Sequence, residues 1–266
     1  MTITLGTPVG PFGKLHEDEA TYRSNPAITR SILEDYLRNP RLCQGMHITG
    51  EYQKPDSDSF RVGTAAHCLV LEPDEFTARY IVPPKMDRRT KEGKEAFSAF
   101  GREHAGKKFL DQEEFDLVHR MAEAVSQNAC AQDLLWGAEV EVVYRHNGTP
   151  LATQCRVDAV TPTHVVDLKT TESLAKFKRS LWDLGYHRQA AWYLEHVDPQ
   201  LPFIFIAVEK SAPYAVGIFQ IESRGLSMAR DQLSDALARL ADSIATNRWE
   251  RDAGVIETVN APPWLP

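Results

Sequence analysis

Two short apolar runs near the middle of the chain each contain an acidic residue, and this feature constrains the fold more than any other. Residues 155–160 and 164–168 flank a Thr-Pro-Thr turn and are typical of paired strands. Asp158 lies in the first run and Asp167 in the second, and Lys169 shares a strand face with Asp167. Because burying a charge is costly unless it is paired or bound to metal, these three side chains require a cation, a partner or a chemical role.

Apolar periodicity and turn signals predict the elements around this hairpin. Helices are expected at residues 30–38, 60–71, 111–128, 172–197 and 225–247, and strands at 139–145, 151–160, 164–169, 203–209 and 215–221. The long helical segment is expected to break near Gly185. This order predicts an α/β fold in which helices flank a mixed central sheet, with a helical N-terminal extension.

The length of the chain allows one large domain with an extension. Residues 1–24, rich in Gly, Pro and charge, are expected to be a loosely ordered lead-in, and residues 25–266 a single domain. The expected parts of this domain are a helical region at 25–110, a core at 111–222, and a C-terminal helix and tail at 223–266. Trp264, in the closing Pro-Pro-Trp sequence, is expected to dock on the body because a large aromatic so near the end favours packing.

The composition is that of an ordinary soluble protein. Hydrophobic residues make up 42% and charged residues 25%, and the net charge of −7 argues against a wholesale basic nucleic-acid binder. Cys43, Cys68, Cys130 and Cys155 are too dispersed for a CxxC motif, so we expect reduced thiols in a cytoplasmic protein. Neither a signal peptide nor an apolar stretch long enough to span a membrane is expected.

The carboxylates form a candidate metal site. Strand alternation puts Glu139 and Glu141 on one face of the strand that precedes Asp158, and Asp167 lies on the strand that follows it. Three carboxylates from neighbouring strands can converge on Mg²⁺ or Mn²⁺, because these ions prefer oxygen ligands. Lys169 could then hold an attacking water or neutralise charge on phosphorus. The sequence leaves open which of the two glutamates takes part.

Two further features allow both a structural and a functional interpretation. Residues 85–108 carry eight Lys or Arg against four Asp or Glu, which fits either a solvated loop or a phosphate-binding strip. Apart from Arg61 near its start, His67 is the one acidic or basic residue in the mostly apolar helix expected at 60–71. Taken alone, it is more often a core histidine than a functional one.

The order Glu139, Asp158 and Asp167-Leu168-Lys169 on an αβββαβ arrangement resembles the PD-(D/E)XK nuclease superfamily. More narrowly, it resembles the RecE-type exonucleases of phages and prophages, the exodeoxyribonuclease VIII family. Matching segments are GTAAHCLVLEPDEF at 63–76, RRTKEGK at 88–94, CRVDAV at 155–160, VVDLKTT at 165–171 and YHRQAAWYLE at 186–195, with NPAITRSILEDYLRNPRLC near the start and PPWLP at the end. The resemblance covers most of the chain and implies a restriction-endonuclease-like core.

The resemblance also implies roles for individual residues. It places His67 in the metal shell with the Leu168 carbonyl oxygen, which reverses the structural interpretation of that histidine. It assigns the acidic residue before the meander to Glu139, with Glu141 as a competitor on the same face. Gln189 and Tyr193 match a Q-x-x-x-Y motif whose one-turn spacing puts both side chains toward the site. The chain departs from the pattern at residue 157, where valine replaces the common proline.

The activity implied is Mg²⁺-dependent degradation of linear double-stranded DNA from its ends, with Mn²⁺ as a substitute and no iron–sulfur cluster. Family members digest 5′ strands and leave 3′ single strands for an annealing protein in recombination. They can form rings, so a homo-oligomer in a bacterial or phage-infected cell is expected. Arg88, Arg89, Lys91 and Lys94 are candidate contacts to DNA phosphates, which carry no sequence information.

Two other functions are compatible with these motifs. A Cas4-like or RecB-like nuclease of the same superfamily would act on single strands, but several of those hold an iron–sulfur cluster with grouped cysteines that this chain lacks. A DNA-end-binding recombination protein with an inactive site belongs to a different class. It is disfavoured because every expected polar position is filled.

Overall fold

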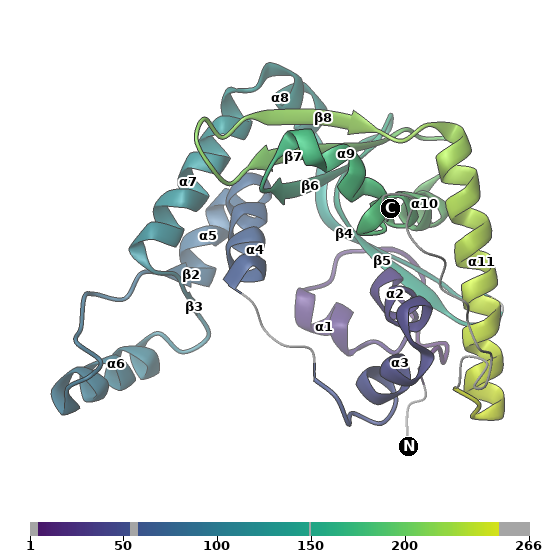
Figure 1. Cartoon of the computed structure of the whole chain (residues 1–266), viewed down its shortest axis with the longest axis horizontal. Coiled ribbons are helices and arrows are strands. Elements are labelled where there is room, and N and C mark those ends of the chain that lie inside the picture. Colours follow the sequence, from purple (N-terminus) through teal and green to yellow (C-terminus); the bar gives the residue numbers. More distant parts are fainter. Residues whose placement is uncertain (1–4, 54–57, 149, 250–266) are drawn as a thin grey trace, which may run out of the picture.

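A six-stranded mixed sheet forms the centre of the computed structural model, which describes residues 5–53, 58–148 and 150–249 (Figure 1). The strands stand in the order β1-β4-β5-β6-β7-β8. Neighbours are antiparallel except β6 and β7, which run parallel and are joined by two helices. The strands are β1 (Gly13–Leu15), β4 (Glu139–His146), β5 (Thr153–Val160), β6 (Val165–Thr171), β7 (Phe203–Glu209) and β8 (Val216–Gln220).

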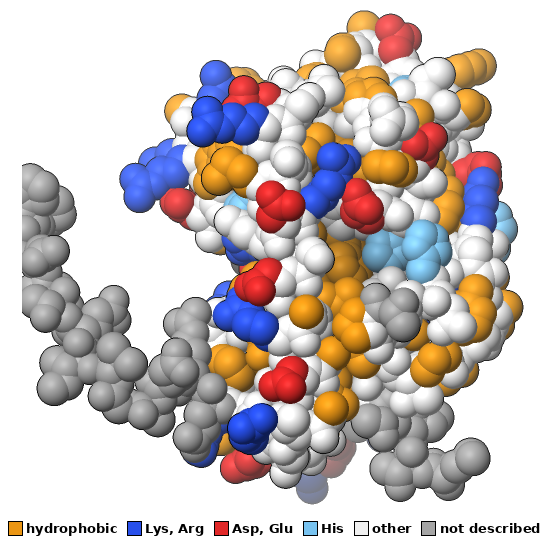
Figure 2. Space-filling model, turned by 90° about the vertical axis from the view of Figure 1, so that its right-hand side faces the viewer, with side chains coloured by type: hydrophobic (Ala, Val, Ile, Leu, Met, Phe, Trp, Pro, Cys, Tyr) orange, Lys and Arg blue, Asp and Glu red, His pale blue; other side chains and the backbone are white. Residues whose placement is uncertain are grey.

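Helices cover both faces of the sheet, and each face has its own hydrophobic core. The first core is closed by α2 (Arg30–Arg38), α3 (Pro40–His47), α9 (Leu174–Asp183), α10 (Tyr186–Val197) and α11 (Ser223–Thr246). The second is closed by α4 (Asp58–Leu71), α5 (Pro73–Arg79), α7 (Gln112–Gln127) and α8 (Ala129–Leu135). Figure 2 views the α11 side, where charged side chains of both signs are interspersed with hydrophobic ones. Among the described residues, no helix is both long and apolar enough to cross a membrane.

Local capping explains where several helices begin. Thr29 caps α2 as the sequence suggests, since its hydroxyl accepts from the Ile32 amide. Asn39 ends α2 and caps α3, whose first residue, Pro40, has no amide hydrogen to leave unsatisfied. The helical segment predicted at 172–197 does break at Gly185, which adopts a φ of 68° in the left-handed region.

A helical arm projects from the body between β2 (Tyr80–Ile81) and β3 (Lys108–Phe109), which pair as a short parallel ladder (Figure 1). The arm carries α6 (Lys91–Glu103), whose Phe97 and Phe100 rings pack on Phe109. The basic stretch at 85–108 thus begins as a loop and continues as this helix. It forms a separate projection and lies outside the sheet.

The N-terminal segment contributes to the sheet, in contrast to the loosely ordered lead-in expected over residues 1–24. β1 pairs with β4, and α1 (Glu19–Ser24) follows it. Arg145 of β4 is 1% exposed, and its guanidinium forms a two-bond ion pair with Glu17 at 3.0 and 2.7 Å. Gln154 accepts a further bond from Arg145. A buried guanidinium needs such partners, so it anchors the early segment. The expected docking of Trp264 lies outside the described residues.

Because Glu17 is the carboxylate partner of the buried Arg145, we expect its replacement to lower the stability of the protein strongly. The substitution Glu17→Ala leaves the buried Arg145 charge without its carboxylate and should lower the free energy of unfolding by about 3 kcal/mol. The matched control is Asp235→Ala, which removes an exposed ion pair with Arg239 on α11 and should cost less than about 0.5 kcal/mol. Urea unfolding of both variants measures the difference. Equal losses would show that the Glu17–Arg145 pair does not anchor the segment.

Candidate active site

The regular alternation of side chains is interrupted in two neighbouring strands, and this interruption creates the site. Val140 and Val142 are two residues apart on β4, yet Val140 packs in the second core and Val142 in the first. Between them Glu141 has a φ of 54°, in the left-handed region that a glutamate seldom adopts. β5 shows the same change of face around Asp158. Glu141 and Asp158 therefore lie where the side chains of β4 and β5 switch from one face of the sheet to the other.

β5 and β6 separate at this point. Their ladder consists of two residue pairs, Ala159 with Val166 and Val160 with Val165. Beyond it the Asp158 carboxylate accepts from the Leu168 amide at 2.8 Å, so a side chain takes the place of a strand carbonyl. The opening between the strands leaves room for functional side chains.

Asp167 and Lys169 lie on the side of β6 that faces α10. Asp167 is fully buried, and its Oδ1 accepts from the Gln189 side-chain amide at 2.5 Å. Its Oδ2 makes no hydrogen bond and forms an ion pair with the Lys169 ammonium group. That ammonium lies 4.9 Å from the centre of the Tyr186 ring, within cation–π range. The D-x-K motif thus forms a buried pair supported by the first turn of α10.

Burial shifts the pKa values of the three acids and of His67. It raises the pKa of Glu141 to about 8, together with the neighbouring Asp158 charge, and it also raises the pKa of Asp158. Burial raises the pKa of Asp167 to about 6, although Lys169 opposes the shift. Burial and the Lys169 charge lower the pKa of His67 to about 4, so its ring is neutral near pH 7. The site holds excess negative charge when its acids ionise, which favours a cation.

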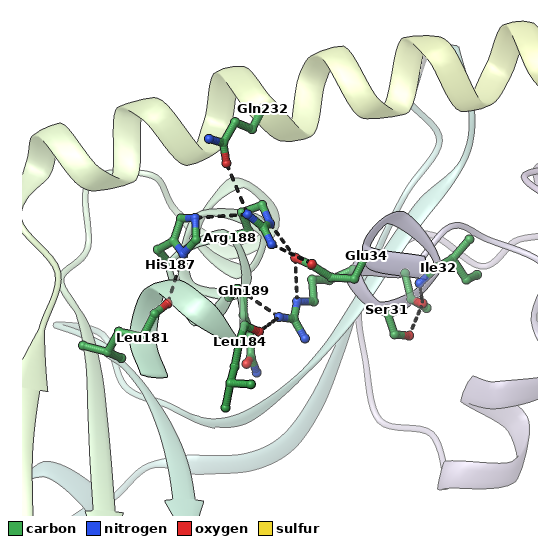
Figure 3. A network of polar contacts seen from close by, with 12 residues as sticks. Ser31, Ile32, Glu34, Leu181, Leu184, His187, Arg188, Gln189 and Gln232 are labelled. Carbon is green, nitrogen blue, oxygen red and sulfur yellow. Dashed lines mark hydrogen bonds and ion pairs between the residues drawn. The ribbon is translucent and has the colours of Figure 1, made fainter. Parts of the chain in front are cut away.

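An ion-pair network holds the turn between α9 and α10 against α2 (Figure 3). Arg30 donates to the carbonyls of Leu184 and Gly185 at 2.8 and 2.9 Å, and Glu34 binds the Arg188 guanidinium through both oxygens. The left-handed φ of Gly185 strains any other residue, and an added Cβ would also approach these groups to 2.7 Å, so the position favours glycine. The network fixes the turn from which Tyr186 and Gln189 reach the D-x-K pair.

The structure brings together most of the sequence-predicted site residues, but not Glu139. The Glu139 side chain is 51% exposed and pairs with Lys14 at 2.5 Å, away from the cavity. Glu141 lies in the cavity opposite Asp158 and pairs with Arg156 at 2.8 Å. The positive φ at Glu141 explains why the expected shared face of the two glutamates is absent. Glu141 is therefore the candidate acidic ligand from β4.

The site opens into a cavity of about 970 Å³. Its lining includes His67, Gln189 and Tyr193, as the sequence predicted. It also includes six cations, of which only Lys108 belongs to the basic stretch that the sequence indicated, and we call them the basic rim: Arg23, Arg30, Arg79, Lys108, Arg156 and Lys210. They come from elements distant in the chain, so no local pattern could have revealed them as a group.

The predicted phosphate-binding strip lies elsewhere. Arg88, Arg89, Lys91 and Lys94 belong to the α6 arm and do not line the cavity. Arg89 pairs with Asp87 at 2.9 Å, and the Arg88 guanidinium lies 4.8 Å from the centre of the Phe97 ring. The base of the arm, at Lys108, is what reaches the cavity.

The donor set fits a divalent cation in chemistry. His67 Nδ1 lies 3.3 Å from Asp158 Oδ2, Glu141 faces the same aspartate, and Asp167 has an oxygen without a hydrogen bond. Carboxylates with one imidazole suit Mg²⁺ or Mn²⁺. In the described part of the chain, no three His, Cys, Asp or Glu side chains are grouped so that they could hold one metal ion. A cation would have to draw these groups together.

Comparisons with known proteins agree with this fold. A family model described as a PDDEXK-like domain of unknown function (DUF3799) matches residues 44–262. A provisionally named exonuclease from Eubacterium rectale has a TM-score of 0.65 at 14% identity, over 93% of this chain and 97% of that one. An alkaline exonuclease from Laribacter hongkongensis has a TM-score of 0.42 at 11% identity, over 83% and 91%. No curated protein matches the sequence significantly.

The different surroundings of the two glutamates predict different responses to divalent cations. At a Mn²⁺ concentration about 100 times Kd, the wild type should gain about 2.7 kcal/mol of stability. The substitution Glu141→Gln should remove most of this gain, whereas Glu139→Gln, which alters an exposed ion pair, should keep it. Thermal unfolding with Mn²⁺ and with chelator measures the gain. A larger loss in Glu139→Gln would return the ligand role to that residue.

Proposed function

Because the chain belongs to the PDDEXK-like family DUF3799, we propose that its buried acid and lysine cluster is the active site of a metal-dependent nuclease. The observation that carries the proposal is the juxtaposition in one cavity of Asp158, Lys169 and Glu141 beside a neutral imidazole, with the buried Asp167 paired to Lys169. A structural role would not require buried acids whose pKa values are raised. The basic rim is suited to phosphates of a polyanionic substrate.

The residues that would hold the cation are Glu141, Asp158 and Asp167, with His67 and the Leu168 carbonyl as further candidates. Bound there, Mg²⁺ or Mn²⁺ supplies a water of lowered pKa and positive charge for the phosphate oxygens. Glu141, whose pKa is raised to about 8, must lose its proton for such binding, which links cation affinity to pH. The neutral His67 ring keeps a lone pair available.

Lys169 is the residue best placed to act on the water or the phosphate. Its ammonium touches Asp167 and packs against the Tyr186 ring, so its position is fixed before substrate arrives. From there it can orient the attacking water and stabilise charge on the pentavalent phosphorus. Gln189 keeps Asp167 in place by donating to the oxygen that Lys169 does not contact.

The proposed substrate is linear double-stranded DNA, attacked from its ends. The cavity lining holds more cations than acids, although Arg23 pairs with Glu19 and Arg79 with Glu72, and such cations suit backbone phosphates that carry no base information. We further propose 5′-to-3′ digestion that leaves 3′ single strands for an annealing protein in phage-type recombination. Assembly into a homo-oligomer, with a ring as the proposed form, and action in the cytoplasm belong to the same proposal.

A cleavage assay tests the activity and its dependence on ends. With Mg²⁺, linear duplex should be degraded and covalently closed circular duplex should persist. The substitution Lys169→Met should slow cleavage by about 10²–10³-fold, because it removes one electrostatic contact to the transition state. Its Mn²⁺-induced stabilisation should remain, since lysine is not a ligand.

Three results would change the interpretation. Equal loss of the circle would indicate an endonuclease. Preference for single strands would favour a Cas4-like or RecB-like activity. Tight end binding without cleavage of either substrate would favour the DNA-end-binding protein.

Two double variants, each of which removes two positive charges, compare the contributions of the basic rim and of the arm to DNA binding. The double substitution Arg23→Ala with Lys108→Ala should weaken duplex binding and lower the slope of log K against log salt by about 2, one for each lost phosphate contact. The double substitution Arg88→Ala with Arg89→Ala should have a smaller effect on the same duplex, because both residues lie on the separate projection. Fluorescence anisotropy in chelator over a salt series measures both slopes. A larger change from the arm variant would move the main DNA contact to α6.

A further inference from the structure

One cation of the basic rim is paired with a candidate metal ligand. Arg156 Nε lies 2.8 Å from Glu141 Oε2, and each of the two side chains is 18% exposed. The other rim cations that form ion pairs among the described residues use acids that are not candidate ligands: Arg23 with Glu19, Arg30 with Glu34, Arg79 with Glu72 and Glu75, and Lys210 with Glu172. Arg156 therefore links the basic rim to the proposed metal site.

The contact between Arg156 and Glu141 is an ion pair without a well-formed hydrogen bond. Arg156 Nε is buried, yet it makes no hydrogen bond of normal geometry with a described residue. A pair of this kind depends mainly on charge, so a cation of higher charge can displace the guanidinium. The backbone of Arg156 is fixed opposite Val143 in the ladder of β4 and β5. Displacement therefore requires movement of the side chain and not of the strand.

A divalent cation and Arg156 would compete for the Glu141 carboxylate. No three acidic, histidine or cysteine side chains in the described ranges are grouped to hold one ion, so a cation has to draw Glu141 and its neighbours together. An ion held there brings two positive charges next to the guanidinium, and like charges repel strongly at contact distance in a partly buried site. The Arg156 charge also reaches Asp158, a second candidate ligand. Cation binding therefore favours release of Arg156 from Glu141.

A released Arg156 would lie where a substrate phosphate must approach. Arg156 lines the same cavity as Glu141, Asp158 and Lys169. A guanidinium presents a planar fork of donors that matches two phosphate oxygens at once. A phosphodiester also brings negative charge, which can replace the Glu141 carboxylate as the partner of Arg156. The same side chain thus has one anionic partner without the cation and another with it.

We propose that Arg156 is a phosphate-binding residue of the active site that becomes available when a divalent cation takes Glu141 from it. The cation and the DNA would then strengthen each other's binding, since linkage between two ligands is reciprocal. The inference rests on the proposed nuclease function and deepens it, because it selects one cation of the basic rim as the contact that couples metal binding to substrate binding.

Cation affinity without DNA tests the competition. Thermal unfolding over a Mg²⁺ series at pH 9 keeps Glu141, whose pKa is raised to about 8, in the ionised form that either partner needs. The substitution Arg156→Gln removes the competing charge, so half of the stabilisation by Mg²⁺ should be reached at an about fivefold lower concentration, as for the loss of one ion pair. Weaker Mg²⁺ binding by Arg156→Gln would show that Arg156 positions Glu141 for the ion, and would overturn the proposal.

The matched control for this measurement is Arg79→Gln. It also removes a paired cation of the basic rim, but the partners of Arg79 are Glu72 and Glu75, which are not candidate ligands. The Mg²⁺ concentration at half stabilisation should therefore shift much less than in Arg156→Gln. An equal shift in the two variants would show a general effect of charge in the cavity and would overturn the competition.

DNA affinity with and without Mg²⁺ tests the release. Every protein in this assay also carries Lys169→Met, so that the blunt duplex is cut slowly enough for fluorescence anisotropy at pH 9. Arg156→Gln should weaken binding about tenfold more in Mg²⁺ than in chelator, because the charge-assisted contact of Arg156 to phosphate exists only with the cation. Arg79→Gln should weaken binding by a similar factor in both. Equal effects of Arg156→Gln in Mg²⁺ and in chelator would overturn the proposal.

A second variant keeps the test decisive if Arg156→Gln fails to fold. Arg156→Lys keeps a positive charge beside Glu141, so its Mg²⁺ affinity should match that of the wild type. Its gain in DNA affinity on addition of Mg²⁺ should be smaller, because lysine cannot bind phosphate through a planar fork. An undiminished gain would overturn the proposal.

The two proposals fail in different ways. If the wild type degrades linear duplex while Arg156→Gln weakens DNA binding equally in Mg²⁺ and in chelator, the role of Arg156 is rejected alone. If the Mg²⁺-dependent effect of Arg156→Gln is present while the wild type cleaves no DNA, the nuclease function is rejected alone.

Discussion

The hydrogen bond from the Leu168 amide to the Asp158 carboxylate is the contact on which the rest of the site depends. A sheet whose strands stay paired has no space between them, and two strands that separate leave amides without acceptors. Here a carboxylate replaces the missing acceptor, so β5 and β6 can part within a continuous sheet. The acids, the lysine and the cavity all lie where this separation begins.

The three buried acids differ in the partners that stabilise their negative charge. Asp167 has the Lys169 ammonium and the Gln189 amide, and Asp158 has the Leu168 amide with His67 nearby. Glu141 has Arg156 as its ion-pair partner, and its pKa is raised to about 8 by burial and by Asp158. Since a neutral acid avoids the cost of buried charge, the raised pKa of Glu141 favours its protonated form near pH 7. A cation that binds Glu141 would have to displace this proton.

The sequence was sufficient for the fold and for the centre of the site. The alternating strands, the D-x-K motif and the break at Gly185 predicted the sheet and its neighbours, because these signals are local. The expected PD-(D/E)XK fold is confirmed by the family match over residues 44–262. Gln189, which the Q-x-x-x-Y match directs toward the site, donates to Asp167 in the structure.

What the sequence could not provide depends on backbone geometry and long-range packing. Strand alternation assumes regular φ angles, so the left-handed Glu141 made Glu139 look equivalent to it. Composition selected the arm as a candidate DNA contact, whereas the basic rim combines single cations from α1, α2, α5, β3 and β5 with Lys210, which directly follows β7. A run of charges is visible in a sequence, but a cluster assembled by folding is not.

The pairing of β1 with β4 has a consequence for the order in which the molecule is completed. Lys14 stands opposite Tyr144, a residue 130 positions later in the chain. Contacts so distant in sequence close late, because a long loop must first lose its freedom. On a ribosome, the segment made first must wait for β4 before it can dock. We therefore expect the wall of the cavity that holds Arg23 to be added after the strands that carry the acid cluster have paired.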